Sequence, residues 1–152
     1  MNIKFLKSSE KKKLLRELEE QFGITELPYL LLETGKEKIR GFSGTMTKEE
    51  IIELSKIANV EIIGLYLFKK EKNLRLSLDA TQILVNQINK NIIEINKDQL
   101  ESWLRGKNLD IIKELGVYVI KYKDTGDFIG CGISDGKKII NYIPKERRIR
   151  NN

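Results

Sequence analysis

Hydrophobic residues recur along this chain with two spacings, one typical of helices and the other of strands. Between Ser9 and Phe22, apolar residues return every three or four positions and Gly23 follows as a stop, which predicts a helix. Thr47 and Glu50 have the spacing of a capping box and predict the start of a second helix. The predicted helices cover Ser9–Phe22, Thr47–Asn59, a segment that begins after a cap at Asp79, and a segment that Asn96 caps and Gly106 ends.

Runs of β-branched and aromatic residues, bounded by glycine, asparagine and aspartate, predict the strands. They cover Tyr29–Thr34, Lys38–Phe42, Glu61–Phe68, Leu74–Leu78, Asn91–Ile95, Val117–Tyr122, Phe128–Ile133 and Lys137–Ile143. Gly35 joins the first two strands as a hairpin, and Lys69–Asn73 is the predicted turn of a second hairpin. Helices and strands mixed in this way predict an α+β fold.

The patterns fall into two groups on either side of residue 90. Residues 1–89 are expected to form a mixed α/β domain, and residues 90–152 a second, β-rich domain with a basic C-terminal segment. No linker rich in glycine, serine or proline separates the two groups. The two halves are therefore expected to share an interface rather than move independently.

Composition excludes several classes of chemistry. The sequence has no histidine and Cys131 is its only cysteine, which excludes an internal disulfide, a cysteine–histidine zinc site and histidine acid–base catalysis. Cys131 lies in a predicted apolar strand, where burial should raise its pKa and make it unreactive. These absences remove most hydrolase chemistry. We expect no catalytic residue, no cofactor, no metal and no enzymatic activity.

The chain also lacks membrane and export signals. It has no run of about 18 apolar residues that would span a bilayer, and its lysine-rich start lacks the apolar core of a signal peptide. These features predict a soluble, cytoplasmic protein with no membrane partner.

Positive charge is concentrated near the C-terminus. Residues 137–150 carry six lysines and arginines against Glu146 alone, which accounts for +5 of the net charge of +6. A basic segment after a nearly neutral body is typical of proteins that bind a polyanion, because phosphate contacts release counterions. A solvated tail without a function is the alternative.

The order of elements after residue 90 resembles a known family. A strand, a short helix that ends in Trp103-Leu104-Arg105-Gly106, and three strands that include Gly130-Cys131-Gly132 resemble a PUA domain over residues 90–150. The preceding segments 64–70 and 74–80 resemble the pre-PUA half of two-domain ribosome-biogenesis proteins. The segments 128–132 and 141–148 are similar to those of archaeal PUA-like proteins related to the Sun/fmu family of RNA cytosine methyltransferases.

The resemblance implies a fold and a function. It implies a pre-PUA-like domain followed by a mixed β pseudo-barrel that binds structured RNA, usually ribosomal or transfer RNA, in RNA modification or ribosome biogenesis. The methyltransferases carry a large catalytic domain with a glycine-rich loop for S-adenosylmethionine and catalytic cysteines after proline, and this sequence contains neither. The hypothesis is therefore a noncatalytic, archaeal type of RNA-binding protein. An adaptor that docks on a separate RNA methyltransferase or ribosomal protein is the alternative, and a stand-alone RNA-modifying enzyme is the least favoured.

The candidate RNA-binding residues lie at the end of the second-half helix and in the basic segment. They are Arg105, Gly106, Lys107, Lys137, Lys138, Asn141, Tyr142, Lys145, Arg147, Arg148 and Arg150. Lysine and arginine suit phosphate, arginine can form two parallel hydrogen bonds, and a tyrosine ring can stack on an unpaired base. The glycines of Gly130-Cys131-Gly132 are expected to allow a bulge or a close approach of RNA, and Trp103 is expected to anchor the core.

Overall fold

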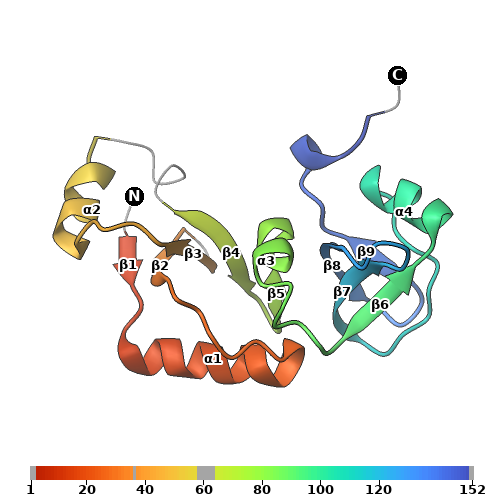
Figure 1. The fold of residues 1–152 in the computed structure, drawn as a ribbon, viewed down its shortest axis with the longest axis horizontal. Helices are drawn as coiled ribbons and strands as arrows, with labels where there is room; N and C mark the ends of the chain where they lie inside the picture. The colour runs from red at the N-terminus through yellow and green to blue at the C-terminus, as the bar shows by residue number, and fades with distance from the viewer. Residues whose placement is uncertain (1–2, 36, 58–63, 151–152) are drawn as a thin grey trace.

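Residues 3–35, 37–57 and 64–150 are described in the computed structural model, and they form two sheets with helices packed around them (Figure 1). In the first sheet the order is β1 (Ile3–Phe5), β2 (Leu30–Thr34), β3 (Lys38–Phe42), β4 (Leu65–Lys70) and β5 (Leu74–Leu76). Each strand is antiparallel to its neighbour. The predicted hairpin around Gly35 is confirmed by the pairing of β2 with β3.

Helix α1 (Ser8–Phe22) packs against this sheet with Leu14, Leu18 and Phe22 buried. Its end follows the prediction, because Gly23 adopts a left-handed φ of 87° and its N–H donates to the carbonyl of Glu19. Helix α2 (Lys48–Ser55) begins at the predicted capping box, in which Thr47 and Glu50 exchange hydrogen bonds. The predicted end of this helix at Asn59 and the start of the next strand at Glu61 lie outside the described residues.

Helix α3 (Leu78–Ile83) lies between the two sheets, where Figure 1 shows it in green. The prediction that Asp79 caps it is wrong, because the hydroxyl of Ser77 accepts the N–H of Ala80 and starts the helix at Leu78. The same hydroxyl donates to the carbonyl of Tyr66 on β4. Ser77 therefore fixes α3 against the first sheet. Because the helix starts at Leu78, β5 ends at Leu76, two residues earlier than predicted.

The second sheet has the order β6 (Ile92–Ile95), β7 (Gly116–Tyr122), β8 (Phe128–Ser134) and β9 (Ile139–Asn141). Strands β6 and β7 are parallel, and α4 (Lys97–Leu104) belongs to the connection between them. The predicted cap at Asn96 is confirmed, since its side chain accepts the N–H of Gln99. A short 3₁₀ helix, η2 (Lys145–Arg147), follows the sheet.

Trp103 anchors the second half, as predicted. Its ring is fully buried, and Nε1 donates to the carbonyl of Ile129 over 2.7 Å. A Cβ atom at Gly132 would lie 2.9 Å from this ring, so the glycine serves packing inside the protein rather than an approach of RNA. The expected bulge is present, because the register of β7 and β8 shifts beside Gly130, whose φ is 78°.

The two halves share an apolar core, as the lack of a linker predicted. One buried cluster includes Leu67 and Leu84 from the first half together with Val119, Phe128 and Cys131 from the second. A hydrogen bond also crosses between the halves, from the N–H of Gly130 to Oγ1 of the buried Thr81 over 3.1 Å. Among the described residues, no helix has the length and apolar character needed to cross a membrane.

Candidate nucleic-acid interface

The end of α4 gathers several of the candidate cations. Gly106 has a φ of 88° and ends the helix, with Arg105 and Lys107 exposed on either side of it. The guanidinium of Arg148 lies directly over Gly106, where a Cβ atom would be 2.7 Å from its Cζ. Nε of Arg148 donates to the carbonyl of Ile143 over 2.9 Å. The chain after β9 thus folds back onto α4 and brings three cations together.

The side chain of Asn141 fixes the end of α4 relative to the segment after β9. The residue is buried, and its Nδ2 donates to the carbonyls of Trp103 and Lys107 over 2.7 and 3.0 Å. Its Oδ1 accepts the N–H of Ile143 over 2.8 Å. The amide of Asn141 therefore forms its hydrogen bonds with backbone groups of the protein, and it connects the end of α4 to the end of β9.

Four exposed cations, two beside Gly106 and two in the segment after β9, have no acidic partner among the described residues. Arg105, Lys107, Lys145 and Arg150 are exposed, and none of them forms an ion pair within 4.0 Å with a described acid. Unpaired cations close together repel one another and attract a polyanion. We call Arg105, Lys107, Lys145, Arg148 and Arg150 the α4 surface.

Lys137 and Lys138 are not part of the α4 surface. They precede β9, whereas η2 follows it, so they lie at opposite ends of this strand. Their backbone N–H groups both donate to Oδ1 of Asp135 over 2.9 Å, which lowers the pKa of that carboxyl. The structure therefore divides the candidate residues between separate places.

Tyr142 and Arg147 line a cleft between the two halves of about 260 Å³. Arg75 of β5 lies over the ring of Tyr142, with 4.0 Å between its Cζ and the ring centre. Nη1 of Arg147 contacts Oδ1 of Asp79 over 3.2 Å, so this cation has an acidic partner. The polar and aromatic lining residues are Lys38, Tyr66, Lys69, Arg75, Ser77, Asp79, Tyr142 and Arg147.

A row of three cations crosses the first sheet into this cleft. Lys38 on β3 is the direct partner of Lys69 on β4, and Lys69 is the direct partner of Arg75 on β5. Like charges directly opposite each other destabilise a sheet. Glu71 compensates in part, at 3.7 Å from Lys69 and 3.6 Å from Arg75.

Sequence reasoning missed this row. It placed Lys69 in a turn, whereas β4 continues to Lys70, and it assigned no role to Arg75 in the alternating pattern of β5. A turn shorter than the predicted Lys69–Asn73 places Lys69 opposite Arg75. This pairing of two cations is the signal in the sequence from which the row could have been predicted. The contact between Arg75 and Tyr142 had no local signal.

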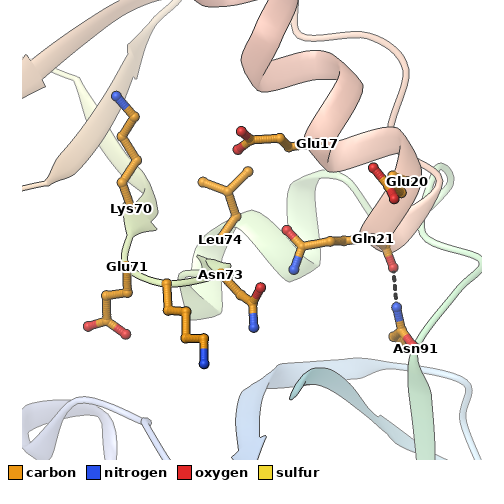
Figure 2. Close-up of a pocket in the computed structure, with 9 residues that line it drawn as sticks. Glu17, Glu20, Gln21, Lys70, Glu71, Asn73, Leu74 and Asn91 are labelled. Carbon is orange, nitrogen blue, oxygen red and sulfur yellow. Dashed lines mark hydrogen bonds between the residues drawn. The ribbon is translucent and has the colours of Figure 1, made fainter. Parts of the chain in front are cut away.

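A larger hollow of about 510 Å³ lies between α1 and the β4–β5 turn (Figure 2). Glu17, Glu20 and Glu71 line it against Lys70 and Lys72, and Figure 2 shows Glu17 and Glu20 on the helix side. The dashed line joins the side chain of Asn91 to the carbonyl of Gln21. Since the acids outnumber the cations, this hollow is a poorer site for phosphate than the cleft.

Cys131 is buried, as predicted, and burial raises the pKa of its thiol to about 12. A thiol with such a pKa is almost fully protonated at neutral pH and is a poor nucleophile. This observation argues against a covalent role for the cysteine.

Comparison with known proteins supports the resemblance. The sequence model of the family described as "Methyltransferase RsmF PUA domain" matches residues 90–149. A search of curated protein sequences gave no match.

Solved structures share the fold over nearly the whole chain. A conserved PUA domain protein from Thermoplasma acidophilum is 16% identical with a TM-score of 0.61, and the match covers 93% of each chain. A hypothetical protein from the hyperthermophilic archaeon Pyrococcus horikoshii is 12% identical with a TM-score of 0.58, over 93% of this chain and 94% of that one. A PUA domain from Aeropyrum pernix, in complex with tartrate, is 10% identical with a TM-score of 0.52, over 95% and 86%. At these identities the likeness shows a common fold.

Proposed function

Residues 90–149 make this chain a PUA-domain protein, and from that premise we propose that it binds structured RNA without catalysing a reaction on it. PUA domains bind RNA, and the proposal adds that the RNA is ribosomal or transfer RNA during its modification or during ribosome biogenesis. The observation that carries the proposal is the α4 surface, whose exposed cations form no ion pair with a described acid. All of its residues except Arg150 fall within the part of the chain that matches the family.

The geometry indicates how this surface acts. Arg148 is held by Ile143 and Gly106, so it meets RNA in a fixed orientation and loses little entropy on binding. Arg105 and Lys107 flank Gly106 beneath it, and Lys145 and Arg150 are exposed in the same segment of the chain as Arg148, so these charges can replace the counterions of phosphates. The surface thus suits the backbone of a folded RNA more than the edges of particular bases.

Ultraviolet crosslinking in cells, followed by sequencing of the RNA and mapping of the peptides, tests the proposal. We expect ribosomal or transfer RNA, joined to peptides that contain residues 105–107 or 145–150. Arg105→Ala with Lys107→Ala should lose most crosslinks, whereas Lys12→Ala with Lys13→Ala, which removes two exposed cations from α1, should keep them. Crosslinks confined to the first half, or to messenger RNA, would contradict the proposal.

A second assay tests the absence of catalysis. Pure protein incubated with the crosslinked RNA and labelled S-adenosylmethionine should leave the RNA unlabelled. Incorporation of label that depends on the protein would overturn the noncatalytic assignment.

The alternative is an adaptor for a separate RNA methyltransferase or a ribosomal protein. Ile112 and Leu115, in the connection before β7, favour it because they remain 80% and 77% exposed. Affinity capture from lysate with and without ribonuclease separates the two functions. A protein partner that survives ribonuclease and is lost with Ile112→Ser supports the adaptor, whereas loss of all partners after ribonuclease supports direct RNA binding.

A further inference from the structure

We infer that the cleft between the two halves binds one unpaired nucleotide of the RNA, so that the first half belongs to the binding surface. This inference rests on the proposed function and adds a second site to it. The site combines the row of Lys38, Lys69 and Arg75 with Tyr142 and Arg147 from the second half.

Charge in the cleft favours a phosphate. Four cations line it, and Asp79 is the acid among its lining residues. Repulsion along the row of Lys38, Lys69 and Arg75 is a cost that an anionic ligand would remove. Glu71 relieves the repulsion only at ion-pair distances of 3.6 and 3.7 Å, which are too long for good hydrogen bonds.

Arg75 provides an independent observation. Its side chain is 12% exposed, and its buried Nε has no hydrogen-bond partner among the described residues. No ligand in the cleft can reach this covered Nε, but the outer nitrogens are little used, since the ion pair of Nη2 with Glu71 is 3.6 Å long. A phosphate at these outer nitrogens would add charge-assisted hydrogen bonds that the described residues do not supply.

The aromatic rings suit a base. Arg75 covers one face of Tyr142, and the residue remains 40% exposed where it lines the cleft. A ring held by a cation on one face offers the other to a nucleobase, as in proteins that bind single strands. Tyr66 adds a second, half-buried ring with Nζ of Lys38 at 5.4 Å from its centre.

The size of the cleft limits the ligand. Its volume of about 260 Å³ is below the range of about 300–1,000 Å³ typical of pockets for drug-sized molecules. A single nucleotide that has left its stack can enter such a space, whereas a double helix cannot. Arg147 lines the cleft and the next residue, Arg148, belongs to the α4 surface, so one RNA can reach both places.

The test compares three RNAs and two neighbouring lysines. The probes are a blunt RNA duplex and two extended duplexes. One extended duplex carries three unpaired nucleotides at the 5′ end of a strand, and the other carries them at the 3′ end. The wild-type protein should bind one of the two extended duplexes at least about five times more tightly than the blunt duplex. Stacking of a single base on an aromatic ring accounts for an increase in affinity of this size. Lys69→Ala should reduce this preference below about twofold.

Lys70→Ala is the matched control. Lys70 follows Lys69 on β4, points to the opposite face, and also has one carboxylate within 4 Å, that of Glu33 at 3.8 Å. It should keep the preference for unpaired nucleotides. Tyr142→Phe should keep it as well, whereas Tyr142→Ala should lose it, and circular dichroism confirms that each variant is folded.

The outcomes separate the inference from the proposed function. Equal binding of the blunt and extended duplexes by the wild type, with weaker binding after Arg105→Ala and Lys107→Ala, would overturn the cleft and leave the α4 surface. A preference lost equally with Lys69→Ala and Lys70→Ala would overturn the cleft as well. Failure of the wild type to bind any of the duplexes would overturn both.

Discussion

Arg147 and Arg148 are adjacent in the chain, but their side chains serve different surfaces. Nη1 of Arg147 contacts Asp79 over 3.2 Å at the cleft, while Nε of Arg148 donates to the carbonyl of Ile143 and its guanidinium covers Gly106. Arg147 is the last residue of the 3₁₀ helix η2 and Arg148 after it is extended, so their side chains leave the backbone in different directions. The segment after β9 thus connects the two proposed contacts with RNA.

Gly106→Ala should destabilise the protein and weaken RNA binding. Alanine in a left-handed conformation costs about 1–2 kcal/mol, and its Cβ would also displace the guanidinium of Arg148. Gly35→Ala is the control, because Gly35 is also left-handed, with a φ of 59°, but no described atom lies within 4 Å of the new Cβ. Urea denaturation should show a larger loss for Gly106→Ala, and only this variant should bind RNA more weakly. Equal effects of the two on RNA binding would contradict the role given to Arg148.

Trp103→Phe should reduce stability without reducing RNA affinity. The change leaves the partly buried carbonyl of Ile129 without its partner, which costs about 1–3 kcal/mol of the free energy of unfolding. Trp103→Ala should cost about 3–5 kcal/mol, since it also opens a cavity. Chemical denaturation measures the first effect, and RNA titration of the folded Phe variant measures the second. A loss of affinity in that variant would indicate that the ring stacks on RNA.

Cys131 should be unreactive in the folded protein. With a pKa of about 12, its thiol is protonated at pH 8, and burial also blocks access. Iodoacetamide should modify the native protein slowly and the protein unfolded in guanidinium rapidly, as mass spectrometry would show. Equally fast labelling in both states would contradict the buried position of Cys131.

Thr81→Val should weaken the contact between the two halves. The substitution leaves the N–H of Gly130 without an acceptor in a buried position, at a cost of about 1–3 kcal/mol. The exposed Thr25→Val should change stability by less than about 0.5 kcal/mol. Because the halves share one core, both variants should still unfold in a single transition in thermal denaturation. Two separate transitions would indicate that the halves fold independently.

Local signals predicted much of the fold. The capping box at Thr47, the cap at Asn96 and the glycine stop at Gly23 lie where the sequence placed them, because each depends on residues within one helical turn. Strand β1 was not predicted, since its three residues are held by pairing with β2 and carry little pattern of their own. Strand β9 is likewise shorter than the predicted Lys137–Ile143, because the chain turns at Asp135–Lys138 before it pairs.

The candidate site was less predictable than the fold. Residue types near the C-terminus indicated a polyanion, and the structure gathers Arg105, Lys107 and Arg148 through contacts between neighbouring elements. The cleft depends on Arg75 meeting Tyr142, which lies 67 positions later in the sequence. Such a contact follows from the packing of the two halves, and a single sequence carries no pattern for it.

The most direct test of the central claim is the salt dependence of binding to a structured RNA, such as a transfer RNA. The slope of log affinity against log salt concentration should become shallower by about one for each phosphate-contacting cation that is removed. We expect Arg105→Ala with Lys107→Ala to lower the slope by about two, and Lys12→Ala with Lys13→Ala to leave it unchanged. An unchanged slope and affinity after Arg105→Ala with Lys107→Ala would contradict binding of RNA at the α4 surface.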